Sequence, residues 1–303
     1  MPSKYTKPVY GHDIPWWIYD VAIAAGCWFS AWASVAWSRW WLAPLAVLVY
    51  GSFIEPRFLI VRRYEVGKGD RALKIAFLSD IHVGPYKRSA WVRKLVERTQ
   101  TLAPDLILLG GDFLHESGGD VVELEPFKDL RAPLGVYAIM GNHDEYKASK
   151  EAHAWFETSG IPLLENRAVH PSQSIAVAGA DDDWYGETDL AAAFAGIRPD
   201  DAAVVMLHNP DLAPHAAALL KGRPGATLFI CGHTHGGQIR LPFIGPVPTL
   251  PHHLGRKYDR GVFAVPGTEG TGMKLVIGAG AGESGPRARL FCPPEIVLVT
   301  MRF

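Results

Sequence analysis

The sequence of 303 residues predicts an α/β layered domain that follows an N-terminal membrane helix or helical hairpin. Two observations predict this class. Beyond Ala72, short apolar runs alternate with stretches whose apolar residues recur at helical spacing, which is typical of strands layered with helices. Before it, a long run nearly free of charge carries most of the tryptophans, seven of ten. With 48% hydrophobic and 20% charged residues, the composition is that of a globular chain.

The first element is the run 14–37, in which Asp20 is the only charged residue. A helix needs roughly 20 apolar residues to cross a bilayer, and tryptophans stand near both ends of this run, where the aromatic belts of membrane proteins lie. We therefore predict one membrane span here. A second apolar segment, 42–54, is short and contains Pro44, so it is either a second span or an interfacial segment. A buried core helix and a cleaved signal peptide are the alternatives to a membrane span.

Basic residues around this region predict its orientation. If only the first segment spans the membrane, four arginines follow it and two lysines precede it; if both span, Arg39 alone lies on the far side. The positive-inside bias places the remainder of the chain in the cytoplasm in both cases. We therefore expect a protein of the cell inner membrane whose residues 72–303 face the cytoplasm, with 1–61 as the anchor and 62–71 as a basic linker. A cleaved signal peptide would reverse this orientation.

The elements expected beyond the linker are strands interspersed with helices. The strands are expected at 73–78, 106–109, 136–140, 175–178, 204–207, 228–230, 274–277 and 296–301. The helices are expected at 92–102, for which Ser89 is a candidate cap, and at 121–130, 190–194 and 212–220. Proline and glycine are dense from 236 to 285, which indicates long ordered loops.

Charge and cysteine content exclude several classes of protein. The net charge of −1 gives no electrostatic case for binding nucleic acid. The three cysteines lie far apart in the sequence, so they match neither a zinc ribbon nor a disulfide framework.

Five expected strands are each followed by side chains that bind metal ions. The segments after them read SDIH, GGD, GNHD, HNPD and GHTH in chain order, and the carboxyl ends of strands in an open α/β sheet are where sites form. The candidate ligands are Asp80, His82, Asp112, Asn142, His208, His233 and His235. They outnumber the ligands of one zinc ion but suit two divalent ions that share a carboxylate. Oxygen and imidazole ligands without thiolates favour manganese, with iron, zinc or cobalt as alternatives.

In this order, SDIH, GGD, GNHD, a lone histidine after a strand, and GHTH resemble the calcineurin-like metallophosphoesterases. The resemblance covers residues 72–303 and implies a two-sheet sandwich flanked by helices. It also implies how the ligands divide. One ion would be held by Asp80, His82 and His235, the other by Asn142, His208 and His233, with Asp112 bridging both. His143 matches the family's catalytic histidine.

The implied activity is hydrolysis of phosphodiester or pyrophosphate bonds by direct attack of a metal-bound hydroxide, without a covalent intermediate. His143 would donate a proton or a hydrogen bond to an oxygen of the substrate. Asp144 is expected either to orient His143 or to be a surface turn carboxylate. The alternatives are a general or cyclic-nucleotide phosphodiesterase and, from another class, a non-catalytic metal-binding scaffold.

Further stretches, among them VAGADD, MLHNPD and LGRKYDRG, resemble a narrower branch of the family. That branch contains bacterial membrane-attached phosphodiesterases and a UDP-diacylglucosamine pyrophosphatase of lipid A synthesis. The resemblance therefore implies the lipid bilayer as a partner and a lipid-linked substrate such as UDP-diacylglucosamine. One departure concerns a serine–arginine pair that the branch tends to carry, because this chain has a glycine- and alanine-rich loop, 278–282, in that place. If the missing arginine binds substrate phosphate in relatives, their substrate does not transfer to this chain; Arg289, further on, does fit the pattern.

Two groups of basic residues are further candidates for binding. Lys87 and Arg88 would form a cationic rim for phosphate, or else begin a solvated helix. Arg256, Lys257 and Arg260 would meet lipid headgroups or a pyrophosphate, or else be ordinary surface charge.

Overall fold

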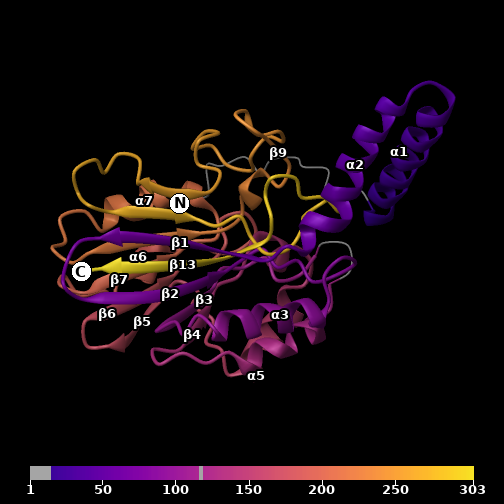
Figure 1. Cartoon of the computed structure of the whole chain (residues 1–303). Helices are drawn as coiled ribbons and strands as arrows, with labels where there is room; N and C mark the ends of the chain where they lie inside the picture. Colours follow the sequence, from indigo (N-terminus) through magenta and orange to yellow (C-terminus); the bar gives the residue numbers. More distant parts are fainter. Residues whose placement is uncertain (1–14, 116–118) are drawn as a thin grey trace.

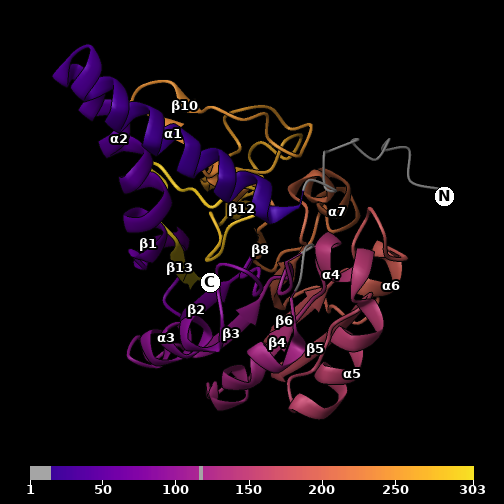
Figure 2. The ribbon, with the colours of Figure 1, turned by 90° about the vertical axis from the view of Figure 1, so that its right-hand side faces the viewer.

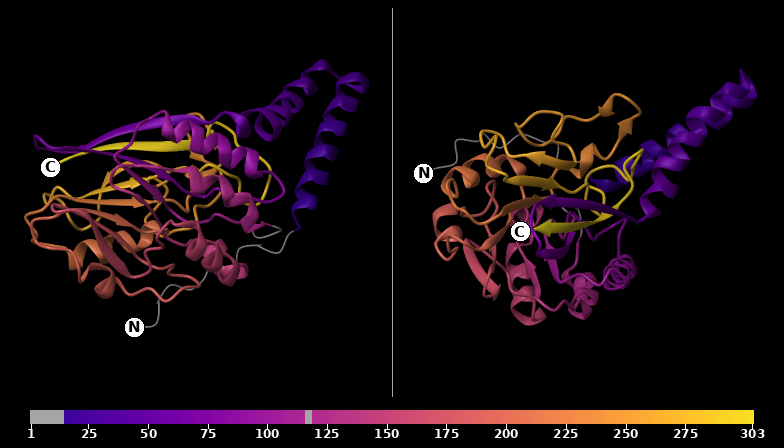
Figure 3. Two further views of the ribbon diagram at one scale, coloured as in Figure 1. Left: turned by 90° about the horizontal axis from the view of Figure 1, so that it is seen from below. Right: turned by 60° about the vertical axis from the view of Figure 1, so that its left-hand side comes forward.

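The computed structural model describes residues 15–115 and 119–303. Ile14, at the start of the predicted span, and Lys4 and Lys7 of the charge count lie outside the described residues. Beyond an N-terminal helical hairpin, the chain forms two stacked sheets with helices on their outer faces, which confirms the predicted sandwich (Figures 1 and 3).

The first sheet has five strands in the order β1-β13-β2-β3-β4. Their bounds are β1 Ile60–Gly67, β13 Glu295–Arg302, β2 Ala72–Leu78, β3 Leu106–Leu109 and β4 Val136–Ala138. Strands β2, β3 and β4 run parallel, while β13 runs antiparallel to β2. The carboxyl ends of these three parallel strands therefore lie at one edge of the sheet.

The second sheet has six strands in the order β11-β12-β8-β7-β6-β5. Their bounds are β11 Gly261–Ala264, β12 Lys274–Ile277, β8 Thr227–Cys231, β7 Ala202–Met206, β6 Ile175–Gly179 and β5 Arg167–Ser172. The four central strands run parallel. A separate pair, β9 Arg240–Leu241 and β10 Gly245–Pro246, forms a small antiparallel hairpin.

Helices cover the outer face of each sheet. The helical segments of the sandwich, short turns in its loops included, are α3 Ser89–Gln100, η4 Val121–Asp129, α4 Asn142–Lys147, α5 Ser149–Ser159, α6 Leu190–Phe194, η5 Pro210–Leu212, α7 Ala213–Leu219 and η6 His235–Gly237. The core between the sheets takes one face of each strand, for example Leu73, Ile75 and Phe77 of β2. The alternate residues, Ala76 and Leu78, pack under α3, η4 and α5, as the period of two along a strand requires. Helices α6 and α7 cover the second sheet.

The segment predicted as a basic linker instead supplies most of an edge strand. Strand β1 pairs in parallel with β13 along its whole length. Arg62 donates from Nε to the buried carboxylate of Glu295 at 2.7 Å, while Val66 is buried between the sheets. The arginines obscured a strand whose apolar residues alternate with them, because an edge strand needs only partial burial. A second difference is η4, which is a 3-10 helix with Pro126 inside it.

The N-terminal residues form a helical hairpin that projects from the sandwich (Figures 1 and 2). Its bounds are α1 Trp16–Ala36, η1 Arg39–Trp41 and α2 Leu42–Val49, followed by η2 Tyr50–Ile54 and η3 Glu55–Arg57. Among the described residues, α1 alone is long and apolar enough to cross a membrane. The side chains of Trp28, Val35 and Trp40 are 70%, 90% and 86% exposed, so no part of the sandwich covers them.

Both ends of the hairpin rest on the sandwich. At the start of α1, the Tyr86 hydroxyl donates to the carbonyl of Trp16 at 3.3 Å. At the end of the hairpin, the buried carboxylate of Glu55 accepts from the backbone amides of Phe291, at 2.9 Å, and Cys292, at 2.5 Å. The bend that joins α1 to α2 is therefore the part farthest from the sandwich, and both helices approach it from the same side (Figure 1).

Candidate metal centre

The predicted ligands follow the carboxyl ends of parallel strands in both sheets, and the sandwich brings them to one edge. Asp80 follows β2, Asp112 follows β3 and His208 follows β7. Five of the predicted ligands hold their backbones in the left-handed region: Asp80, His82, Asp112, His233 and His235, with φ of 52°, 47°, 55°, 69° and 50°. Such conformations are costly for residues other than glycine, and they gather at functional sites.

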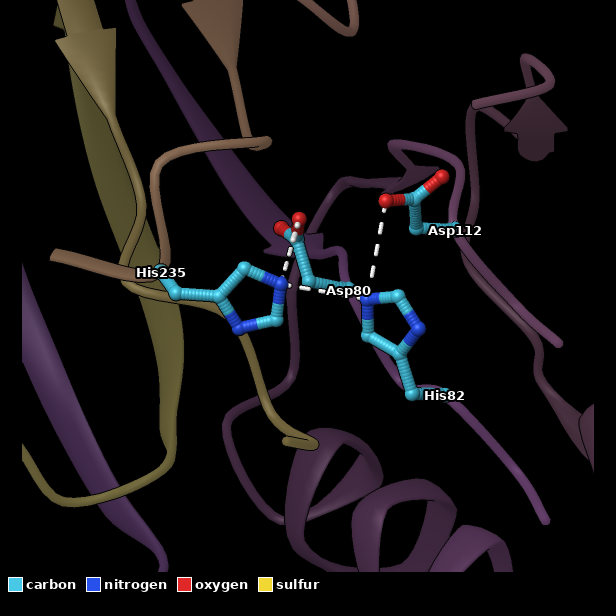
Figure 4. A group of neighbouring side chains, drawn as sticks. All are labelled: Asp80, His82, Asp112 and His235. Carbon is cyan, nitrogen blue, oxygen red and sulfur yellow. Dashed lines mark hydrogen bonds and ion pairs between the residues drawn. The ribbon is translucent and has the colours of Figure 1, made fainter. Parts of the chain in front are cut away.

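One group of side chains is formed by Asp80, His82, Asp112 and His235, all buried, with ligand atoms within 4.8 Å of one another. Figure 4 shows the four side chains turned toward a common point. The Nε2 atoms of His82 and His235 lie 3.1 Å apart. His82 Nε2 lies 3.5 Å from Asp112 Oδ2, and His235 Nε2 lies 3.5 Å from Asp80 Oδ1. Four donors converging in this way can surround one cation.

A second group shares Asp112 with the first. Its other members are His208 and His233, both buried, and the ligand atoms again lie within 4.8 Å of one another. His208 Nε2 lies 3.2 Å from Asp112 Oδ2, and the two imidazole rings are 5.1 Å apart at their centroids. Asn142, which is 2% exposed, lines the same pocket as Asp112 and His233. Asp112 therefore stands between two potential cation sites.

Buried polar atoms test whether this site fits metal ions. Oδ2 of Asp80 and Oδ1 of Asn142 are buried and make no hydrogen bond within the described ranges 15–115 and 119–303. Leaving such atoms without a partner costs about 1–3 kcal/mol each. A cation at each of the two sites would satisfy one of these atoms, and carboxylate, amide and imidazole donors suit Mn, Fe, Zn or Co. The residues present therefore fit the two-ion site implied by the sequence resemblance.

The surroundings of Asp112 favour the charged form of its carboxylate. Burial alone would raise the pKa of Asp112, but the imidazoles of His208 and His143 outweigh burial and hold this pKa well below its usual range. Burial lowers the pKa values of His233 and His235 well below the ordinary value, aided by neighbouring cationic groups. These two rings are thus neutral near pH 7 and offer lone pairs to a metal. Burial raises the pKa of Asp80 to about 6.

His143 lies beside the candidate metal ligands and lines the pocket above them. Its backbone amide donates to Oδ1 of Asp112 at 2.9 Å, and its Nε2 lies 4.0 Å from Oδ2 of the same carboxylate. Its ring stands perpendicular to that of His82, with centroids 4.8 Å apart. The structure therefore brings the predicted catalytic histidine to the edge of the site, within reach of a ligand in the pocket.

Asp144 is fully buried, so it is not a surface turn carboxylate. Its Oδ1 accepts from the amides of Phe113 and Leu114 at 2.8 and 3.0 Å, and its Oδ2 accepts from the amide of Gly141 at 3.1 Å. These bonds fasten the loop after β4 to the loop after β3. Burial, and then the charge of Asp112, raise the pKa of Asp144 to about 7.

A pocket of about 270 Å³ opens above the metal-binding side chains. Loop residues 248–251 and 284–286 form part of its wall, and Trp184 stands edge-on to His233 with ring centroids 4.6 Å apart. Tyr19 of α1 completes the lining. The apolar hairpin and the metal-binding side chains therefore border one cavity.

The glycine-rich loop 278–282 packs directly on the first ligand segment. Gly280 has φ of +70°, and a Cβ there would lie 2.6 Å from the Cβ of Asp80. The amide of Gly282 donates to the carbonyl of Asp80 at 2.6 Å. The guanidinium of Arg289, fully buried, donates to the carbonyls of Gly282 and Ala279 at 3.0 and 2.9 Å. Arg289 thus braces this loop beneath the site, a position that the sequence pattern alone did not reveal.

The basic candidates at the start of α3 do not form a rim around the pocket. Lys87 is 4% exposed; its Nζ lies 3.2 Å from Glu283 Oε1 and donates to the carbonyl of Pro56 at 2.5 Å. Arg88 pairs with Glu123 at 3.2 Å. Lys87 therefore joins the base of the helical hairpin to the sandwich, which neither sequence interpretation anticipated.

Comparison with known proteins points to one family. The calcineurin-like phosphoesterase family matches residues 73–237. A metallophosphoesterase of Caenorhabditis elegans is 31% identical over 80% of this chain. The match covers half of that protein's own length. A phosphodiesterase of Escherichia coli is 29% identical over 83% of this chain and 92% of its own length. A UDP-2,3-diacylglucosamine pyrophosphatase of Chlamydia muridarum is 26% identical over 85% of this chain and 93% of its own length.

Proposed function

Because this chain belongs to the calcineurin-like phosphoesterase family, we propose that it is a membrane-anchored hydrolase of phosphodiester or pyrophosphate bonds that uses two divalent cations. The observation that carries this proposal is the pair of buried ligand groups that share Asp112 at one edge of the sandwich. A scaffold that had lost catalysis would not need to maintain so many strained, buried donors at one point.

The proposed ligands divide between two cation sites. Asp80, His82 and His235 would hold the first ion and Asn142, His208 and His233 the second, while Asp112 would serve both. When bound, the two ions lower the pKa of a water molecule toward neutrality and neutralise the phosphoryl oxygens. Manganese is the first candidate for the ion, followed by iron, zinc and cobalt, because the donors are oxygen and imidazole.

Residues of the chain itself complete the proposed chemistry. His143 faces the pocket and donates a proton or a hydrogen bond to the leaving oxygen or a phosphoryl oxygen. Asp144 acts as a positioning residue, because its carboxylate holds the loop that carries His143. Trp184 and residues 248–251 wall the pocket and limit the access of bulk water.

A lipid-linked substrate is the proposed substrate class. Tyr19, on the membrane helix, lines the same pocket as His143, so a phosphoryl group at the site lies next to the anchor. An amphiphile can therefore place its head among the metal ligands while its acyl chains stay beside α1. The name of the Chlamydia relative supports UDP-diacylglucosamine as the first compound to test. Tethering also raises the local concentration of any substrate that shares the bilayer.

The proposed location is the inner membrane, with the sandwich on the cytoplasmic face. The charge pattern around α1 supports this orientation, since Arg57 ends the hairpin and Arg62 and Arg63 follow it in β1. Both ends of the hairpin rest on the sandwich, so the anchor enters the membrane from the side on which the sandwich lies.

The test is hydrolysis by the full chain in detergent micelles supplied with Mn²⁺. A bis-aryl phosphodiester, an aryl phosphomonoester and UDP-diacylglucosamine are compared. We expect hydrolysis of the diester and of the lipid, with the monoester the slowest of the three. Turnover of the diester without turnover of the lipid would favour a general phosphodiesterase whose anchor only sets location; a cyclic nucleotide, tested next, would identify a cyclic-nucleotide phosphodiesterase. Bound metal without any turnover would favour the scaffold.

A further inference from the structure

The small hairpin β9–β10 carries exposed apolar side chains at its turn. Phe243 is fully exposed, Ile244 is 65% exposed, and Leu241 and Val247 are about half exposed. Phe243 has φ of +66°, so the backbone there adopts a costly conformation that leaves the ring in solvent. A cluster of large apolar residues held outward marks a surface that contacts something apolar.

The groove behind this turn is cationic. It is lined by Arg240, Arg256, Lys257, Arg260 and a single acid, Asp259. Arg240 pairs with Asp259, while no ion pair joins the other three to a carboxylate in the part of the chain that the structure describes. Arg256 donates to the carbonyl of Pro246, which holds its charge directly behind β10. Apolar residues in front of unpaired cations form an amphipathic surface that complements an anionic lipid leaflet.

This surface is continuous with the base of the helical hairpin. The carbonyl of Leu290 accepts from the amide of Arg240 at 2.9 Å. The amide of the preceding residue, Arg289, donates to the carbonyl of Gly51 at 2.8 Å. Phe291, 52% exposed, borders both the cationic groove and the pocket formed at the hairpin base by Tyr50. Figures 1 and 2 place the β9–β10 hairpin on the side of the sandwich from which the helices project.

We propose that the β9–β10 turn is a second membrane contact, which inserts Phe243 and Ile244 into the interface of an anionic leaflet while the exposed Arg256 and Lys257 meet the lipid phosphates. The guanidinium of Arg260 donates instead to Cys292 Sγ and to the carbonyl of Phe291. This second contact rests on the membrane anchoring proposed above, but not on the hydrolytic activity. The chain continues from β10 into residues 248–251, which wall the metal-site pocket. Contact of the turn with the leaflet therefore sets the mouth of that pocket at the membrane surface.

The test places a polarity-sensitive fluorophore at position 243 of the full chain. Cys231 and Cys292 are buried, so a Cys27→Ser, Phe243→Cys variant directs the label to the turn. The labelled chain is reconstituted into phosphatidylcholine nanodiscs with and without phosphatidylglycerol, and quenching by lipids spin-labelled near the headgroup is measured. The matched control carries Leu219→Cys, because Leu219 is exposed and lies near the amino end of β8, away from the metal edge.

We expect quenching at position 243 in the anionic discs, about twofold or more above that at position 219. Lys257→Glu should reduce the quenching in anionic discs, and Lys257→Arg should retain it. Equal quenching at both positions in a chain that co-purifies with the discs overturns the second contact while leaving the anchor intact. Failure to co-purify contradicts the anchor and the second contact together. Neither outcome bears on the hydrolysis measured in micelles.

Discussion

Asp112 is the residue on which both halves of the site depend. Its Oδ2 faces His82 at 3.5 Å and His208 at 3.2 Å, while its Oδ1 accepts the amide of His143. One carboxylate thus orders the two ligand groups and the histidine beside them. Its backbone is left-handed, and the glycine before it, Gly111, has φ of +86°. A Cβ at Gly111 would overlap the backbone at Gly141, so the GGD segment is glycine-rich because two loops meet there.

Individual site residues could be predicted from the sequence where a short local pattern marks them. Asp80, His82 and the later histidines each follow an apolar strand, so their gathering at one edge follows from strand polarity. The roles of Lys87 and Arg289 were not predictable. Lys87 is buried against Glu283 and the hairpin base, which lie far away in sequence. Arg289 donates to backbone carbonyls of nearby residues, and a carbonyl acceptor leaves no side-chain signal in the sequence.

Removing the imidazole of His143 should separate chemistry from metal binding. His143→Ala deletes a donor that lines the pocket but leaves the seven proposed ligands in place. We expect metal content to stay unchanged and kcat to fall roughly 10²–10⁴-fold, the range typical of a positioned proton donor. Turnover and elemental content are measured on the same preparation. His170→Ala, outside the site on β5, is the control; wild-type kcat in His143→Ala would remove the proposed role.

At the scale of elements, buried strands were the most readable. Strands β2, β3, β7 and β8 are nearly continuous apolar runs because parallel strands are covered on both faces. The edge strand β1 was missed because its arginines made it resemble a linker. The second apolar segment, 42–54, coincides with α2 and η2, and the 3-10 turn η3 follows it to Arg57.

Gly282, in the loop 278–282, should tolerate no added side chain. A methyl group at Gly282 would overlap the carbonyl oxygen of Ile81, between the ligands Asp80 and His82. We expect Gly282→Ala to destabilise the fold by about 1–3 kcal/mol and to weaken metal binding, because the loop must shift. Thermal unfolding and metal titration measure the two effects. Gly196→Ala, where the new methyl group meets Ala168 at 3.5 Å, should change neither; equal behaviour of the two variants would refute the packing argument.

Lys87 should make stability rise with pH above neutrality. Burial lowers its pKa to about 8, although Glu283 acts in the opposite direction. An unfolded chain releases this proton only near pH 10.4, so between these values the unfolded state binds more protons and stability increases with pH.

The measurement is the unfolding midpoint of the full chain in micelles from about pH 8 to about pH 10, compared with Lys87→Met. The difference between wild type and variant should shift in favour of wild type across this window. The exposed Lys94→Met variant should run parallel to wild type. A wild-type advantage that shrinks as the pH rises would contradict the buried, depressed lysine.

At the scale of the molecule, the sequence predicted two packed sheets and an apolar anchor but not how they meet. The resemblance to a family supplied the sandwich, because sheet order depends on pairings such as β13 between β1 and β2 that no local pattern encodes. The first helix of the hairpin begins beside the pocket that the candidate ligands line, so the apolar hairpin and the candidate ligands occupy one end of the molecule.

A two-ion site that shares Asp112 is tested by the transition-metal content of the active full chain, measured alongside that of Asp112→Asn. We expect about two ions per chain in the wild type and loss of metal and of phosphodiester hydrolysis in the variant, because the shared charge is removed. Asp200→Asn, at an exposed turn, should bind metal as the wild type does. Active protein without bound metal, or an Asp112→Asn variant with wild-type metal content, would contradict the account.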